Sequence, residues 1–117
     1  MREILFRGKR KDCNDWEIGN FSAYSHSDGT KRCYINGFEY EVYPETVGQY
    51  TGLTDKNGKK IFEGDIVAMG IVRAYEVKYD SGSFYMDGTA IPIRHIDRFE
   101  VIGNIHDNPE LLKGGVE

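Results

Sequence analysis

Apolar and polar side chains alternate along this chain in short stretches, and most stretches have the two-residue period of a β-strand. Stretches with the helical period are almost absent. Fourteen glycines, together with many Asn and Asp residues, separate the stretches, and these residue types favour tight turns. The pattern predicts an all-β protein built from short strands.

The most informative stretch covers residues 49–67, QYTGLTDKNGKKIFEGDIV, and predicts a β-hairpin followed by a kinked strand. The Asn-Gly pair at the hairpin turn suits either a type I′ turn or a type I turn with a G1 bulge. In the following Glu-Gly-Asp bend, the glycine permits the change of direction and the aspartate can accept a bond from a nearby backbone N–H. We assign a structural turn role to five residues, Asp55, Asn57, Gly58, Gly64 and Asp65.

Two further hairpins are predicted in the N-terminal part. The first has a half-buried strand over residues 2–8, a polar turn over residues 9–15 and a returning strand from Trp16 that breaks at Gly19. The second has its turn at an Asn-Gly pair within residues 33–43. The apolar face of this second hairpin is expected to consist of Tyr34, Phe38, Tyr40 and Val42.

Five strands are expected after Gly64, over residues 65–69, 71–79, 83–86, 89–93 and 99–105. Their order, with a polar bend before the last strand, is typical of a small SH3-like barrel. Asn108 as a cap and Pro109 at the first helical position then predict about one turn of helix. We expect a single domain over residues 1–117, with N-terminal β-hairpins (1–48), an SH3-like barrel (49–107), and a turn of helix with a loose tail (108–117).

Composition narrows the class of protein. No apolar run approaches the roughly 20 residues of a membrane span, and the N-terminus lacks the continuous apolar region of a signal peptide. We therefore expect a cytoplasmic protein with no membrane partner. A formal net charge of −4 argues against unspecific polyanion binding as its main work.

The side chains that often carry chemistry are scattered. Cys13 and Cys33 do not form a C-x-x-C motif, and His26, His95 and His106 lie far apart, so we predict no cofactor and no metal site. The hairpin turn of residues 49–67 resembles a calcium loop only superficially, because its glycine comes at position 4 instead of position 6. We predict no catalytic residue.

Two local clusters support minor alternatives. Glu63 and Asp65 could form a catalytic carboxylate pair at their bend, although a capping role for Asp65 is favoured. A basic run beside an aromatic residue is the mixture that single-strand nucleic-acid binders use. Its members are Arg7, Lys9, Arg10, Lys11 and Trp16. The favoured interpretation of this run is a solvated turn that Asp12, Asp15 and Glu17 partly neutralise.

Eight tyrosines exceed what a core of this size readily buries, because each buried hydroxyl needs a hydrogen-bond partner. Some of them are therefore expected at an interface. A homo-oligomer would account for them as well as a foreign partner would.

Three blocks, MREILFRG, QYTGLTDKNGKKIFEGDIV and FEVIGNIHDNPELL, together resemble the YopX family of phage and prophage proteins. The resemblance implies a phage or prophage origin and a mostly β fold, and it supplies no catalytic residues. The leading hypothesis is a non-enzymatic accessory protein that binds a host or phage protein. A single-stranded nucleic-acid-binding module is the alternative, and a small enzyme ranks last.

Overall fold

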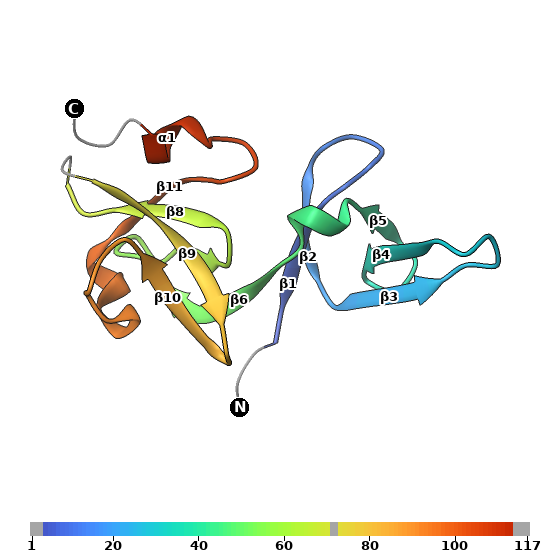
Figure 1. Ribbon diagram of the computed structural model, residues 1–117, viewed down its shortest axis with the longest axis horizontal. Helices are drawn as coiled ribbons and strands as arrows, with labels where there is room; N and C mark the ends of the chain where they lie inside the picture. Colours follow the sequence, from blue (N-terminus) through green and yellow to red (C-terminus); the bar gives the residue numbers. More distant parts are fainter. Residues whose placement is uncertain (1–3, 71–72, 114–117) are drawn as a thin grey trace. The chain divides into compact units, whose positions relative to one another are not determined.

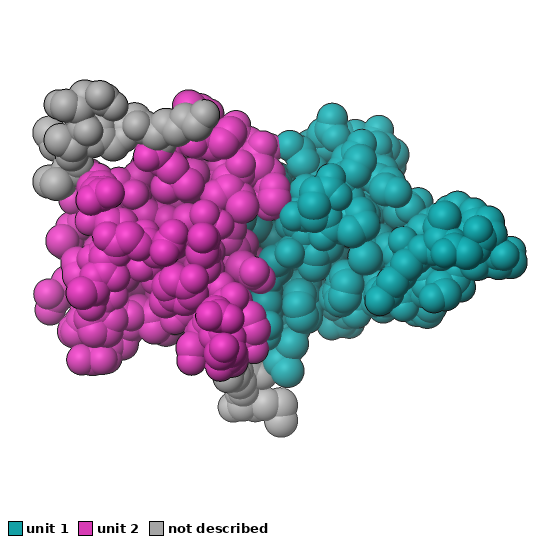
Figure 2. Space-filling model, viewed as in Figure 1, with its two compact units in different colours: residues 1–50 teal, residues 51–117 magenta. Residues whose placement is uncertain are grey.

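The computed structural model describes residues 4–70 and 73–113, which form mainly antiparallel strands (Figure 1). The chain divides into two compact units, Met1–Tyr50 and Thr51–Glu117 (Figure 2). The all-β class, with one short C-terminal helix, is confirmed.

The first unit contains a hairpin and a separate three-stranded sheet. Its elements are β1 (Phe6–Lys9), β2 (Trp16–Gly19), β3 (Phe21–Ser25), β4 (Lys31–Ile35), β5 (Tyr40–Val42), the 3₁₀ helix η1 (Pro44–Thr46) and the start of β6 (Gly48–Thr54). Strand β1 pairs with β2 and with the start of β6, and the separate sheet has the order β3-β4-β5. Cys33, Ile35 and Val42 are the buried core of this unit.

The Asn36-Gly37 hairpin forms, but its loop differs from the expected one. Ile35 pairs directly with Tyr40, so four residues lie between the strands. Both Asn36 (φ 62°) and Gly37 (φ 71°) take left-handed conformations there. Phe38 consequently stands in the turn and is 64% exposed. The expected single apolar face was therefore wrong, because Tyr40 and Val42 pair with the core residues Ile35 and Cys33, whereas Phe38 contacts Tyr34.

The second unit is built around an antiparallel sheet with the order β10-β9-β8-β11, which curls into a half-barrel where a small SH3-like barrel was predicted. Its elements are β7 (Lys60–Phe62), β8 (Asp65–Ala68), β9 (Ala74–Asp80), β10 (Ser83–Asp87), the 3₁₀ helix η2 (Ile93–Arg98), β11 (Glu100–Asn104) and α1 (Glu110–Lys113). The buried core consists of Ile61, Val67, Val77, Met86, Ile96 and Phe99.

The strand expected over residues 89–93 does not form. Gly88 turns the chain with φ of 100°, and Pro92 stands in extended conformation directly before η2. Since proline has no N–H to donate to a sheet ladder, this segment cannot continue the sheet as predicted. Part of the strand expected over residues 71–79 lies outside the described residues, and β9 begins at Ala74.

The hairpin of residues 49–67 forms with a type I turn and a G1 bulge, which decides between the two turn types. The Gly58 N–H donates to the Asp55 carbonyl at 3.0 Å, and Gly58 alone of the turn residues is left-handed (φ 83°). Gly64 takes φ of 94° at the following bend. There its N–H donates to the Val77 carbonyl at 2.8 Å, which ties the bend to β9.

The C-terminal helix has the expected single turn, but Asn108 has another role than the expected cap. Its Oδ1 accepts a hydrogen bond from the Asn104 N–H at 3.2 Å, at the end of β11. The Leu111 N–H bonds to the Asn108 carbonyl at 3.0 Å. The Asn108 side chain thus joins the end of β11 to the start of the helix.

Candidate protein-interaction surface

An exposed group of aromatic rings lies on the face of the β3-β4-β5 sheet that is opposite the core of the first unit. Successive side chains of a strand point to opposite faces of its sheet. Cys33 and Ile35 of β4 are core residues, so Tyr34 between them belongs to the outer face. Ser22 pairs with Tyr34, and Tyr24 pairs with Arg32, which places Tyr24 on that face too.

Three rings make contact on this outer face, and we call Tyr24, Tyr34 and Phe38 the aromatic face. Tyr24 and Phe38 stack with centroids 4.4 Å apart and planes at 19°. Tyr34 meets Phe38 edge-on at 5.1 Å and lies 5.8 Å from Tyr24. Tyr34 is 7% exposed, whereas Tyr24 is 38% and Phe38 64% exposed. The stacked pair therefore presents apolar ring surface to solvent above a buried tyrosine.

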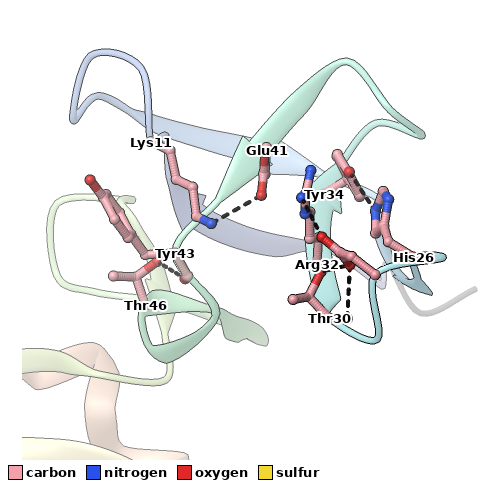
Figure 3. Close-up of polar contacts among 9 residues, drawn as sticks. Lys11, His26, Thr30, Arg32, Tyr34, Glu41, Tyr43 and Thr46 are labelled. Atoms are coloured by element: carbon pink, nitrogen blue, oxygen red, sulfur yellow. Dashed lines mark hydrogen bonds and ion pairs between the residues drawn. The ribbon is translucent and has the colours of Figure 1, made fainter.

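Polar contacts fix the loop beside the aromatic face (Figure 3). The Tyr34 hydroxyl hydrogen bonds with His26 Nε2 at 3.0 Å, as the figure shows. The Asp28 carboxylate accepts bonds from the Thr30 hydroxyl at 2.6 Å and the Thr30 N–H at 3.0 Å. The Thr30 hydroxyl is the main cause of the lowered pKa of Asp28. These bonds hold the loop of residues 26–30, and the His26 bond fixes the hydroxyl of Tyr34, on which the other two rings pack.

The structure places the predicted basic run on β1 and the turn that follows it. Arg7 is buried, and its guanidinium carbon lies 4.8 Å from the centre of the Trp16 ring. The Lys9 ammonium lies 5.8 Å from the same ring. These three side chains do come together, but the Trp16 ring already has cations beside it.

The other two basic residues are neutralised by carboxylates. Arg10 binds both oxygens of Asp12, at 2.9 and 2.8 Å, and Glu17 at 3.2 Å. The Asp12 contact raises the pKa of Arg10 and lowers the pKa of Asp12. Lys11 reaches Glu41 of β5 at 3.0 Å, a contact drawn in Figure 3. A strand of phosphates would therefore have to displace these ion pairs.

The carboxylate of Asp65 is bonded within its own bend. Asp65 is buried, and its Oδ2 accepts a bond from the Phe62 N–H at 2.8 Å. Glu63 beside it is half-buried. This contact is the capping role that sequence favoured, so the bend needs its carboxylate to hold the backbone.

The cysteines and histidines are candidate metal ligands by residue type. Cys13 and Cys33 are both free thiols, the first exposed and the second buried. His95 lies in η2, and His106 follows β11. Among residues 4–70 and 73–113, no three His, Cys, Asp or Glu side chains are grouped so that they could hold a metal ion.

Sequence reasoning identified the tyrosine surplus but not the aromatic face. The strand pairing alone places two of its rings together, because Tyr24 and Tyr34 lie on neighbouring antiparallel strands at positions whose side chains point to the same face of the sheet. Sequence reasoning missed the length of the loop after Ile35, which brings Phe38 into contact with Tyr24.

None of the helices in the described part of the chain is long and apolar enough to span a membrane.

Comparison with known proteins gives a structural relative and a family. The crystal structure of protein EF1440 from Enterococcus faecalis superposes with a TM-score of 0.64 at 27% sequence identity, covering 96% of this chain and 99% of that one. No curated protein matches the chain. The family model described as YopX protein matches residues 5–113, which is nearly the whole chain. The chain therefore belongs to the YopX family.

Proposed function

We propose that this protein is a phage or prophage accessory protein that works without catalysis, by binding a host or phage protein in the bacterial cytoplasm. The observation that carries the proposal is the aromatic face. Tyr24 and Phe38 are exposed rings in direct stacking contact, supported from below by Tyr34. Exposed apolar groups of this kind are characteristic of interaction sites.

The energetics favour a protein partner. Aromatic residues are enriched among the few interface residues that carry most of the binding free energy. Complete burial of one such side chain contributes roughly 1.5–3 kcal/mol. Because Tyr34 and the bonded loop hold the rings in place, little side-chain entropy remains to be lost on binding.

The test is affinity capture of the tagged protein from phage-infected cells, with and without nuclease. Phe38→Ser removes the most exposed ring of the aromatic face. Phe38 stands in a turn, so the backbone of the sheet does not depend on its side chain. The control is Tyr85→Ser on β10, which removes an exposed ring (38% exposed, against 64% for Phe38) from the other unit. We expect a nuclease-resistant partner that Phe38→Ser loses and Tyr85→Ser retains. Equal capture by both variants would exclude the aromatic face.

Single-stranded nucleic acid is the alternative partner. The cations beside Trp16 support it, while the ion pairs of Arg10 and Lys11 oppose it. If nucleic acid is the ligand, an oligonucleotide binds at low salt with an affinity that falls steeply as salt rises, and charge reversal at Arg10 and Lys11 abolishes binding. Our proposal instead expects partner capture to be unchanged by that reversal.

A further inference from the structure

Strand β3 is the open end of the three-stranded sheet in the first unit. The sheet order is β3-β4-β5, so β3 has a neighbour on one side only (Figure 1). The far side of β5 is covered, because Arg10 bridges to Val42 and the Lys11 N–H donates to the Glu41 carbonyl at 3.0 Å. Any extension of this sheet must therefore occur at β3.

The hydrogen-bond parity shows which backbone groups point outward from β3. The Asn36 N–H donates to the Asn20 carbonyl at 2.8 Å, and the His26 N–H donates to the Thr30 carbonyl at 2.7 Å. In an antiparallel pair, bonded and non-bonded positions alternate. Even-numbered residues thus bond to β4, and odd-numbered ones direct their N–H and C=O groups away from it. The outward residues are Phe21, Ala23 and Ser25.

This edge lacks the devices that usually protect sheet edges. Its sequence, FSAYS, has no charge and no proline, and its pairing with β4 has no bulge. The edge strand β11 of the second unit differs. Its register shifts between Val101 and Gly103, and the Asp55 carboxylate accepts a bond from the Val101 N–H at 2.9 Å.

We propose that the outer edge of β3 pairs with the same edge of a second copy of this chain, antiparallel, about a two-fold axis at Ala23. In this register Ala23 faces Ala23 of the second copy, and Phe21 faces Ser25. Each outward residue then donates one main-chain hydrogen bond and accepts one. The axis is perpendicular to the sheet, so the two aromatic faces come to lie on the same side of one continuous sheet.

Three observations favour a second copy as the occupant. The edge is self-complementary, because its outward groups are symmetric about Ala23. It is uncharged, so a strand that meets its own copy brings no like charges together. The far side of β5 is covered, so each sheet has one open edge, and pairing through it gives a closed dimer and not a fibre. The inference is separate from the proposed function, since it uses the strand edge and not the aromatic face.

A contact of five strand residues buries less than the roughly 800 Å² per partner of a standard interface. We therefore expect a dissociation constant between about 10 µM and about 1 mM. Sedimentation equilibrium of the full chain over that range measures it. Ala23→Lys and Ala23→Glu each place two like charges opposite one another at the axis. Each variant alone should dimerise at least about ten-fold more weakly.

An equal mixture of the two Ala23 variants should restore the dimer, because Lys then faces Glu across the axis. Native mass spectrometry identifies the heterodimer. Ser25→Pro, which removes one outward donor and adds no charge, should weaken the wild-type dimer in the same way. Ser83→Lys on the edge strand β10 is the control and should have no effect.

The proposal is overturned if the wild-type chain stays monomeric up to about 1 mM, if the Ala23 variants dimerise as well as wild type, or if their mixture forms no heterodimer. Circular dichroism checks that each variant is folded. In the capture experiment, loss of the partner in Phe38→Ser but not in Ala23→Lys would leave the proposed function standing without the dimer.

Discussion

At the scale of single residues, Asp55 connects more of the second unit than any other polar side chain described above. It is 4% exposed, and its Oδ1 accepts bonds from the Asn57 and Lys59 N–H groups at 2.8 and 2.9 Å. Its Oδ2 accepts the Val101 N–H at 2.9 Å. Burial alone would raise the pKa of this carboxyl, but the three backbone donors outweigh burial and lower it.

Asp55→Asn should destabilise the protein by about 1–3 kcal/mol at neutral pH, because the amide keeps one acceptor oxygen and leaves buried N–H groups unsatisfied. The folded-state pKa of Asp55 is lowered, so its contribution is present above the unfolded value of about 3.9. The contribution is lost as pH falls through the lower folded value. Urea unfolding of both proteins from neutral to acid pH measures the difference.

Asp97→Asn, at an exposed position of η2, is the control for that substitution and should leave the unfolding free energy almost unchanged. A difference between wild type and Asp55→Asn that stays constant down to strongly acid pH would contradict the role assigned to the Asp55 charge.

Sequence predicted only the local half of this role. The bonds to Asn57 and Lys59 follow from turn chemistry within a few residues. The bond to Val101 joins positions 46 apart, and nothing in the local pattern indicates it. The basic turn shows the same limit. The pairing of Arg10 with Asp12 is local and was expected. The contact of Lys11 with Glu41 joins two different hairpins, and the local pattern does not indicate it.

At the scale of elements, the hairpin turn before β7 depends on the left-handed conformation of Gly58. A Cβ atom at this position would meet nothing within 4 Å, so a substitution there tests the backbone conformation alone. Asn tolerates the left-handed region better than other residues do, and β-branched residues tolerate it least. Gly58→Val should therefore destabilise the protein by about 1–2 kcal/mol more than Gly58→Asn.

The urea midpoints of the two Gly58 variants and wild type give that comparison. The structure predicts the order wild type, then Asn, then Val. Equal midpoints for Asn and Val would mean that the turn changes its type to accommodate them, contrary to the bonding seen between Asp55 and Gly58.

The elements that sequence predicted well are those defined by turn residues. Asn36-Gly37 and Asn57-Gly58 indicated their hairpins because the left-handed region is open to few residue types. The segment after Gly88 was assigned as a strand on its apolar residues. Residues 89–92 form neither helix nor strand, because Pro92 offers no N–H to a sheet. The 3₁₀ helix η2 begins only at Ile93, at the polar bend expected before the last strand, and it places Ile96 in the core with Phe99, a burial that depends on distant partners.

At the scale of the whole molecule, the two units have cores of unequal size. Three fully or almost fully buried apolar residues form the first core, and six form the second. Local stability follows the number of buried apolar contacts. Backbone amides in the first unit should therefore exchange with solvent faster than those of β8 and β9 in the second unit, as hydrogen exchange with mass spectrometry would show.

Val42 and Val77 offer a matched pair for testing whether the cores are independent, since each is a valine that is 0% exposed. Replacing either with Ala removes two buried methyl groups and costs about 2 kcal/mol. Val42→Ala should accelerate hydrogen exchange by up to about 30-fold in residues 4–50 and leave exchange in residues 73–113 unchanged. Val77→Ala should accelerate exchange in residues 73–113 and leave residues 4–50 unchanged. Peptides from β6 are left out because that strand crosses the boundary between the units. If either variant accelerates hydrogen exchange uniformly along the chain, the two units unfold as one cooperative body. A local loss of packing would then raise the population of the fully unfolded chain instead of the population with one open unit.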